Sequence, residues 1–332
     1  MPRPHAMILA AGFGTRLESL TSLRPKPMLP VCGRPLVEWC AHWLSRHGIQ
    51  DVAINLHHLG EQIEAHIGTG ESLGLRVRYS REHGEILGTG GGLLRARSLL
   101  VRSGDAPIVV TNGKIITDID LSAALDFHRA GGYEATMVLR EDLEGVWKGN
   151  LRVARDGRLG SLIGEQLGGA TLDERPMMFT GIHILEPSML DRIPREGAPC
   201  VVRTAYMDAF REGRVGGFVT RDYWWEHSTI DRYVTGVGNV LGGTVERPWW
   251  TSSICEEHEA RAREMGATVA GPVWLEAGAA LGENVALGSG CQVDADARVA
   301  SNISIQRGVV WSGARVSASF SAGVWTHNGL AQ

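Results

Sequence analysis

Cysteine pairs, long apolar runs and an excess of charge of one sign are all missing from this 332-residue chain. Its formal net charge is only −4, which argues against a general binder of nucleic acids or membrane surfaces. Its five cysteines include no CxxC pair, and an odd number suits reduced thiols better than a disulfide framework. We therefore expect a cytoplasmic protein in which anionic ligands meet local clusters of cations.

The apolar segments are short. The first, residues 6–10, spans only about five positions, too few for a signal-peptide core or a membrane span, and no later segment is long enough either. No group of histidine, cysteine and aspartate has the spacing of zinc ligands. We therefore expect no membrane partner and no zinc site.

The length suits two domains, and the first part of the chain shows an alternating pattern. Up to about Leu241, short apolar runs alternate with helical patterns, which predicts βαβ units and a mostly parallel, Rossmann-like α/β sheet. Ligands of such sheets bind beyond the carboxyl ends of the strands. The expected strands are residues 6–10, 51–55, 75–79, 107–111, 134–139, 150–153 and 179–185, and the expected helices are 36–47, 59–67 and 91–101.

The end of the chain repeats every six residues, which is typical of a parallel β-helix with triangular coils. Exposed coil ends often pair with a neighbouring chain, so we expect a homo-oligomer. The predicted domains are residues 1–245 and 267–332, with a connector at 246–266. One apolar register comprises Val269, Leu275, Leu281, Leu287, Val293, Val299, Ile305 and Trp311, and a second comprises Val273, Ala279, Val285, Cys291, Ala297, Ile303 and Val309.

A glycine-rich segment, LAAGFGTRL, follows the first expected strand. Glycines let backbone N–H groups approach phosphates closely, and Arg16 and Lys26 add fixed positive charge. A dinucleotide-binding GxGxxG site is the structural alternative, but no acidic residue follows a second strand at the required place. The predicted nucleotide contacts in this segment are Leu9, Ala11, Gly12, Gly14 and Thr15.

With the PKP motif at residues 25–27, this segment resembles the signature of the sugar-1-phosphate nucleotidyltransferases, the NDP-sugar pyrophosphorylases. EILGTGG at 85–91, KGN at 148–150, TG at 180–181 and WEHST at 225–229 resemble further segments of that family in the same order. Many members carry a left-handed β-helix behind the nucleotidyltransferase domain, so the resemblance covers essentially the whole chain. It implies nucleotide contacts at Gly88, Thr89 and Asn112 and a sugar pocket formed by Lys148, Gly149, Asn150, Glu165, Thr180 and Gly181.

The resemblance also implies a reaction. A sugar 1-phosphate attacks the α-phosphate of a nucleoside triphosphate and pyrophosphate leaves, so the protein mainly aligns and neutralises charge, here through Arg16 and Lys26. The GGG at residues 90–92 and the HHL at 57–59 resemble bacterial guanylyl- and uridylyltransferases, with GTP and mannose 1-phosphate as the leading pair. Without that resemblance, His57 and His58 are typical of surface residues.

Two positions depart from the family pattern. Members hold Mg²⁺ through one Asp directly after Asn-Gly and a second before Ile-Gly-Thr, and here those positions are Lys114 and Glu226. A carboxylate can ligate Mg²⁺ but an ammonium cannot. Lys114 with Glu226 has the same zero net charge as two Asp with one Mg²⁺, so Lys114 is a candidate replacement for the metal and a third catalytic cation. A silent, NDP-sugar-binding regulatory subunit is the alternative.

A second departure lies at residues 163–166, IGEQ, where the family commonly has Glu-Lys-Pro. Glu165 can keep a contact to a sugar hydroxyl, and Lys148 is the candidate for the missing lysine. Asp118 and Asp120 could relocate a metal, but the DIDL run is more typical of a helix N-cap before Leu121. An acyltransferase acting through the β-helix is disfavoured, because that segment has no histidine before His327.

Overall fold

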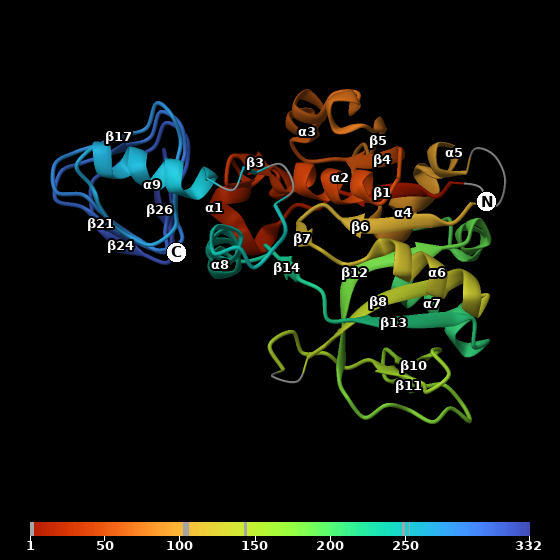
Figure 1. Ribbon diagram of the computed structural model, residues 1–332. Helices are drawn as coiled ribbons and strands as arrows, with labels where there is room; N and C mark the ends of the chain where they lie inside the picture. The colour runs from red at the N-terminus through yellow and green to blue at the C-terminus, as the bar shows by residue number, and fades with distance from the viewer. Residues whose placement is uncertain (1–2, 102–105, 143–144, 248–249, 252) are drawn as a thin grey trace. The chain divides into compact units, whose positions relative to one another are not determined.

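The computed structural model describes residues 3–101, 106–142, 145–247, 250–251 and 253–332, without the side chains of Thr15 and Glu18 (Figure 1). The chain forms two compact units, and each is described by itself. The predicted boundaries at residues 245 and 266 stay predictions. The first unit contains Met1–Gly12, Cys40–Gly113 and Ile119–Trp224, and the second contains Phe13–Trp39, Lys114–Asp118 and Trp225–Gln332.

A seven-stranded sheet in the order β13-β8-β12-β6-β1-β4-β5 forms the centre of the first unit (Figure 1). All neighbouring pairs are parallel except those of β12, which is antiparallel to both β6 and β8. This confirms the predicted Rossmann-like α/β class. The strands are β1 (His5–Leu9), β4 (Asp51–Leu56), β5 (Arg76–Arg81), β6 (Ile108–Asn112), β8 (Ala135–Glu141), β12 (Met177–Leu185) and β13 (Val215–Thr220).

The pairing defines one functional edge of this sheet. Because β12 opposes both of its neighbours, β6 and β8 run in the same direction, and six of the strands end at the same edge while β12 begins there. Parallel strands buried on both faces read as continuous apolar runs, as in the almost entirely buried β6 and β8. Ligand-binding side chains are expected at this edge.

The helices of the first unit follow most of the expected ranges. Asp120 caps α6 as predicted, because its Oδ1 accepts from the N–H groups of Ser122 (2.9 Å) and Ala123 (3.1 Å). The single helix predicted at 91–101 is wrong: it is two helices that meet at Ala96, since apolar periodicity does not report a change of backbone path at one residue. The helices are α2 (Leu36–Arg46, divided between the units), α3 (Gly60–Ile67), α4 (Gly88–Arg95), α5 (Arg97–Leu100), α6 (Leu121–Gly131) and α7 (Ala205–Arg211).

A small antiparallel sheet, β11-β10-β9, completes the strands of the first unit. It comprises β9 (Arg152–Val153), β10 (Leu159–Leu162) and β11 (Glu165–Gln166). The expected strand at 150–153 is therefore shorter than predicted. The 3-10 turns of this unit are η3 (Glu71–Leu73), η4 (Pro187–Arg192) and η5 (Val201–Arg203).

Three stacks of short strands form a parallel β-helix in the second unit. Thr268 lies opposite Ala286 and Ala286 opposite Ser304, so one coil takes 18 residues (268 to 286 to 304), or three of the predicted six-residue repeats. The last coil is shorter, since Ile305 lies opposite Phe320, 15 residues on (305 to 320). The six-residue register is lost before that coil, because Val309 and Val310 lie opposite Gln292 and Val293, 17 residues back. The predicted registers therefore hold as far as Ile305 and are wrong at Val309 and Trp311. The first stack comprises β15 (Thr268–Ala270), β18 (Ala286–Gly288), β21 (Ser304–Gln306) and β24 (Phe320–Ser321). The second comprises β16 (Val273–Leu275), β19 (Cys291–Val293), β22 (Val309–Val310), β25 (Val324–Thr326) and β26 (Gly329–Ala331). The third comprises β17 (Ala280–Leu281), β20 (Arg298–Val299) and β23 (Arg315–Val316).

The same unit contains the continuation of the glycine-rich loop and, in its described residues, three further α-helices. Gln292, on β19, bridges to the β2-β3 turn: its Oε1 accepts from the Cys32 N–H (2.8 Å) and its Nε2 donates to the Pro30 carbonyl (3.2 Å). The elements are η1 (Thr15–Leu17), α1 (Glu18–Thr21), η2 (Lys26–Met28), β2 (Pro30–Val31), β3 (Arg34–Pro35), β7 (Ile115–Thr117), β14 (Trp224–Glu226, divided between the units), α8 (Ile230–Leu241) and α9 (Ile254–Glu264).

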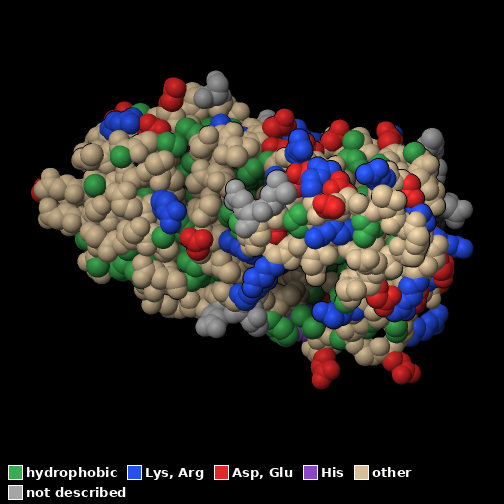
Figure 2. Space-filling view, turned by 90° about the horizontal axis from the view of Figure 1, so that it is seen from below, with side chains coloured by type: hydrophobic (Ala, Val, Ile, Leu, Met, Phe, Trp, Pro, Cys, Tyr) green, Lys and Arg blue, Asp and Glu red, His purple; other side chains and the backbone are tan. Residues whose placement is uncertain are grey.

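Two surface properties bear on the predicted partners. Within the described ranges, no helix combines the length and apolar character needed to cross a membrane. On the face drawn in Figure 2, basic and acidic side chains are intermixed, in keeping with the small net charge. The expected lack of nucleic-acid and membrane partners stays a prediction.

Asp294 makes the stability of the β-helix depend on pH. It is fully buried, accepts from Gln292 Nε2 at 2.7 Å, and burial together with the nearby Glu276 raises its pKa from 3.8 to about 8. The folded chain therefore holds a proton between about pH 4 and 8 that the unfolded chain releases, so the free energy of unfolding falls as pH rises through this window. In Asp294→Asn we expect a flatter profile in urea unfolding at pH 5 to 8.

Asp296→Asn is the matched control for that experiment. Asp296 is exposed and has a positive φ that Asn also tolerates. The control should keep the slope of the natural chain. Equal slopes for the Asp294 variant and the natural chain would contradict the assignment of the proton to Asp294.

Candidate functional site

A buried chain of hydrogen bonds joins the ends of β1, β4 and β5 in the first unit. Asn55 Oδ1 accepts from the Ala10 N–H (2.7 Å), Asn55 Nδ2 donates to Glu82 Oε1 (2.8 Å), and Glu82 Oε2 accepts from the Leu87 N–H (3.0 Å). The chain fixes where β1 turns into the glycine-rich loop and where α4 begins. Asn55 and Glu82 were not predicted; the available signal is a polar residue at the end of each of two strands.

The predicted nucleotide contacts of the first unit lie along this edge. Leu9 and Asn112 are the last residues of β1 and β6 and are register partners. Ala11 and Gly12 follow β1 directly, and Gly88 is the first residue of α4. The Thr89 hydroxyl accepts from the Val201 N–H (3.0 Å), so part of its hydrogen-bonding capacity is used within the protein.

Gly181 allows Asn112 to lie over β12. Its φ is +78°, and a Cβ there would lie 2.1 Å from Asn112 Nδ2, so a larger residue would both strain the backbone and displace Asn112. Both residues were predicted, on different segments, as nucleotide and sugar contacts. The structure brings them together.

The other predicted sugar contacts have different surroundings. The Thr180 side chain is buried and donates to the Val138 carbonyl (2.8 Å). Lys148 has a φ of +54°, the Gly149 N–H donates to Asp142 (2.6 Å), and Asn150 is exposed. Their contacts with sugar stay predictions.

Glu165 lies on β11 and forms a two-point ion pair with Arg211, whose Nε and Nη2 lie 3.0 and 2.6 Å from its oxygens. This hydrogen bonding lowers the pKa of Glu165. A sugar hydroxyl that binds Glu165 therefore has to compete with Arg211 for the carboxylate, or share it with Arg211.

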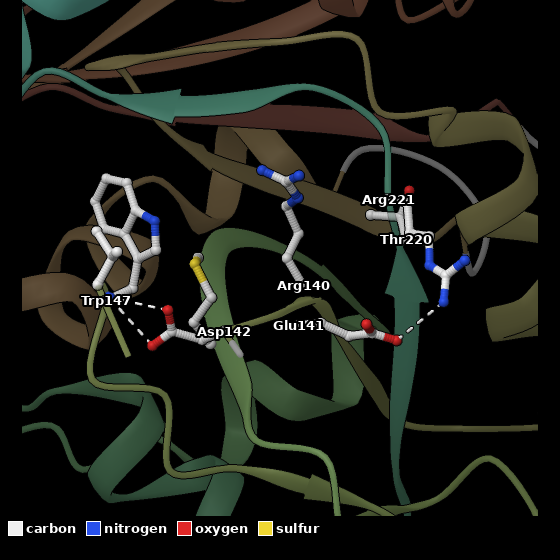
Figure 3. A pocket seen from close by; sticks show the side chains of 8 residues that line it. Arg140, Glu141, Asp142, Trp147, Thr220 and Arg221 are labelled. Atoms are coloured by element: carbon white, nitrogen blue, oxygen red, sulfur yellow. Dashed lines mark hydrogen bonds and ion pairs between the residues drawn. The ribbon is translucent and has the colours of Figure 1, made fainter. Parts of the chain in front are cut away.

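A cavity of about 330 Å³ opens at the ends of β8 and β13 and the start of β12 (Figure 3). None of the predicted sugar contacts lines it, although Lys148 follows one lining residue directly. It was not predicted from the sequence, where a charged RED triplet at the end of an apolar strand was the available signal. The lining residues are Arg140, Glu141, Asp142, Val146, Trp147, Met178, Thr220 and Arg221.

A cluster of charges in the second unit contains all of the predicted catalytic residues. Glu226, on β14, lies 3.0 Å from Lys114 Nζ and 3.6 Å from Arg16 Nη2, measured from Oε1. Lys26 is buried, and its pKa falls to about 8 because burial, Lys114 and Arg16 all disfavour its charged form. Lys114 is held at the start of β7, where its carbonyl accepts from the His227 N–H (3.1 Å).

Gly14 lets the loop close over Lys26. Its φ is +70°, and a Cβ there would lie 2.8 Å from Thr21 Cγ2 and 3.1 Å from Lys26 Cε. The carbonyl of Gly14 accepts from the Leu17 N–H (2.9 Å), which begins the short helical turn carrying Arg16. The side chain of Thr15, another predicted contact, lies outside the described residues.

The donors at the predicted Mg²⁺ position do not fit a magnesium ion. Lys114 has no lone pair to offer, and Oε1 of Glu226 is shared between two cations. Among the residues that the structure describes, no cluster of three or more His, Cys, Asp or Glu could hold a metal. Lys114 and Glu226 therefore form an ion pair where the family resemblance implies two carboxylates.

The largely parallel sheet, with a glycine-rich segment directly after its first strand, defines a Rossmann-like α/β protein. The profile of the nucleotidyl transferase family matches residues 5–145. The chain is 35% identical over 231 residues to N-acetylmuramate alpha-1-phosphate uridylyltransferase of Neisseria meningitidis, covering 68% of this chain and 94% of that protein. The chain therefore belongs to the nucleotidyl transferase family, and its relatives are sugar-1-phosphate nucleotidyltransferases.

Two further similarities extend this result. Mannose-1-phosphate guanylyltransferase of Mycobacterium tuberculosis is 29% identical over 293 residues, which cover 87% of this chain and 78% of that protein. The crystal structure of HddC from Yersinia pseudotuberculosis matches with a TM-score of 0.56 at 21% identity, over 71% of this chain and 99% of that one. The structural match supports the fold.

Replacing Gly181 tests the contact with Asn112. We expect Gly181→Ala to lower the free energy of unfolding by about 2 kcal/mol or more, because it adds both a strained φ and a steric clash. Urea unfolding measures the change. Gly164→Ala is the control for backbone strain alone, because Gly164 has a φ of +82° but no atom lies near its added Cβ. Gly168→Ala, which also has no atom near its added Cβ, should leave the free energy of unfolding almost unchanged. A Gly181 variant no less stable than the Gly164 variant would rule out the clash.

Proposed function

We propose that this chain transfers a nucleotidyl group from a nucleoside triphosphate to a hexose 1-phosphate and releases pyrophosphate, with GTP and mannose 1-phosphate as the leading pair. Family membership and the cation cluster support the reaction. The similarity to the mycobacterial mannose-1-phosphate guanylyltransferase supports GTP and mannose 1-phosphate as the substrates. The neisserial relative is instead named as a uridylyltransferase for N-acetylmuramate 1-phosphate. A panel of bases and sugars is therefore the appropriate assay.

The charge of the cluster carries the proposal. Glu226 pairs with Lys114 and Arg16, and all three charges act on Lys26. Three cations and one carboxylate leave a net charge of +2 for a polyphosphate. At an effective dielectric constant near 20, one unit charge about 4 Å from a phosphate oxygen contributes roughly 4 kcal/mol. Such charges stabilise the developing negative charge as the bond from the α-phosphorus to pyrophosphate breaks and the sugar phosphate oxygen bonds to the α-phosphorus. Arg16, whose side chain is 58% exposed, is free to meet the leaving pyrophosphate.

Lys114 takes the electrostatic place of Mg²⁺ in this proposal. Its ammonium is a compact cation 3.0 Å from the carboxylate that stands at the second metal-ligand position. The proposed role is charge neutralisation alone, because an ammonium does not bridge two phosphate oxygens as a metal ion does.

A silent regulatory subunit that binds NDP-sugars is the second candidate. The observation that favours it is the same ion pair, in which Lys114 and Glu226 satisfy each other without a ligand. Homo-oligomeric assembly and a cytoplasmic location stay predictions for either candidate.

Pyrophosphate release from the four common triphosphates and a set of sugar 1-phosphates, with Mg²⁺ or with excess chelator, tests the proposal. We expect turnover with one pair that survives the chelator. Lys114→Met should lower kcat/KM by about 100-fold or more, and Lys114→Arg should retain most of it, because only the latter keeps the charge. Lys114→Asp should become active only with Mg²⁺.

Loss of all activity of the natural chain under chelator would contradict the role of Lys114. No turnover across the panel, with tight NDP-sugar binding retained, would instead establish the regulatory candidate.

The lowered pKa of Lys26 predicts that the activity depends on pH. Its free-enzyme pKa of about 8 means that its charge is present below about pH 7 and is lost as pH rises through 8. We therefore expect kcat/KM for the triphosphate to fall above pH 8, and Lys26→Arg to move this decline to higher pH because guanidinium stays charged. A decline at the same pH in both enzymes would exclude Lys26 as its origin.

A further inference from the structure

A second cavity of the first unit lies away from the ligand-binding edge of the sheet. It has a volume of about 620 Å³ and is lined by the end of α4, the start of α5 and the turn η4. Leu185, which ends β12, pairs with Ile108, which begins β6, so η4 follows at the edge where the parallel strands begin. Figure 1 shows α5 at this same edge, near the N-terminus of the chain. None of the predicted site residues is among the described residues that line this cavity.

The charged side chains of this cavity are mainly basic. Arg95, Arg97 and Arg195 line it together with one acidic residue, Asp191. Arg97 Nη1 lies 2.7 Å from Asp191 Oδ1, and this hydrogen bond, helped by the charges of Arg97 and Arg195, lowers the pKa of Asp191. Arg195 is therefore close enough to act on the same carboxylate. Three guanidinium groups and one carboxylate leave the cavity with a net charge of +2.

This positive charge is not neutralised by the surrounding protein. In the part of the chain that the structure describes, Arg95 and Arg195 form no ion pair within 4.0 Å. Glu196, which follows Arg195, is exposed and is not among the lining residues. Charges of one sign around a hollow with apolar walls concentrate their potential inside it, which attracts ions of the opposite sign.

The inner wall of the cavity is aliphatic. Leu190 and Ile193 are buried, and the partly buried Leu94 packs against the same core. Arg95 and Arg195 are exposed, so the charged groups lie nearer to solvent than this wall does. A ligand with one anionic group and a small carbon skeleton can therefore meet the arginines and also bury apolar surface.

Contacts within the protein hold the cavity wall in place. Ile193 lies so close to α4 that a Cβ on Gly90 would be 2.9 Å from Ile193 Cγ2. The Gly90 N–H donates to the Pro199 carbonyl (2.8 Å), which fixes the segment after Ile193 against the same helix. Because α4 also carries Arg95, both sides of the cavity are positioned before a ligand binds, and this lowers the entropic cost of binding.

We propose that this cavity is an anion site that binds a phosphate dianion, either free or carried by a small organic molecule. Above about pH 7 a phosphate monoester carries close to two negative charges, which match the net charge of the cavity. The planar guanidinium of arginine can donate to two phosphate oxygens at once. The proposal goes beyond the proposed function, because the cavity belongs to the first unit and the cation cluster to the second.

Calorimetric titration of the full-length chain at pH 8 tests the proposal, with inorganic phosphate, phenyl phosphate and uncharged phenol as probes. We expect Arg195→Gln and Arg95→Gln each to weaken binding of phenyl phosphate by roughly five-fold or more. Asp191→Asn should strengthen it, because the change removes a competing carboxylate and releases Arg97. Arg129→Gln is the matched control, since Arg129 forms a similar ion pair with Asp126 (3.3 Å) on α6, away from the cavity.

The opposite signs separate charge from damage to the fold. A misfolded cavity would weaken binding in every variant, whereas the proposal requires a loss for the arginine variants and a gain for Asp191→Asn. A Kd in both arginine variants equal to that of Arg129→Gln overturns the proposal, and so does phenol that binds as tightly as phenyl phosphate. Failure of the natural chain to bind either phosphate also overturns it.

Two further comparisons identify the ligand and the location. Tighter binding of phenyl phosphate than of inorganic phosphate assigns the cavity to a phosphate ester, and equal binding assigns it to free phosphate. Lys114→Met lowers the charge of the cation cluster and should leave this binding unchanged. Binding that is lost in Lys114→Met but kept in Arg195→Gln would place the phosphate at the cluster and overturn the proposal, whether or not the chain is a transferase.

Discussion

The carboxylate of Glu226 holds the cation cluster of the second unit together. One of its oxygens lies 3.0 Å from Lys114 and 3.6 Å from Arg16, and its negative charge favours the charged form of the nearby Lys26. Without this carboxylate, three cations would repel one another in a partly buried space. With it, two positive charges remain for a ligand, and the protein itself holds them in place before a ligand arrives. Charges that are held in place in this way need no rearrangement when a charged ligand binds.

The β-helix contributes to the same unit through buried polar contacts. Gln292 bonds the β2-β3 turn, and the Tyr233 hydroxyl donates to the Pro30 carbonyl (2.5 Å) while accepting from Trp311 Nε1 (3.2 Å). The guanidinium of Arg24 lies 5.2 Å from the centre of the Trp311 ring. These contacts fix the segment on either side of Lys26. A repetitive coil is well suited to this, because its stacked strands are hydrogen-bonded to one another and offer rigid positions for single polar side chains.

Local patterns predicted most of the fold. The alternation of strands and helices, the N-cap at Asp120 and the six-residue repeat as far as Ile305 each depend on neighbours along the chain, and the structure confirms them. The predicted helix at 91–101 failed at Ala96, because hydrophobic periodicity continues across a residue at which the backbone changes path. The hydrogen bonds that link Asn55 and Glu82 were not predicted either, since polar residues at strand ends carry no periodic signal.

The sequence by itself determined the class of the protein, the glycine-rich loop and the replacement of the expected metal ligand by Lys114, because these depend on residue type and local spacing. Tertiary structure alone decided that Lys114 lies against Glu226, that Gly181 makes room for Asn112, and that Arg140 faces a cavity beside Trp147. These contacts join residues far apart in the chain. They arise from strand order and register, which the hydrophobic pattern of each strand does not encode.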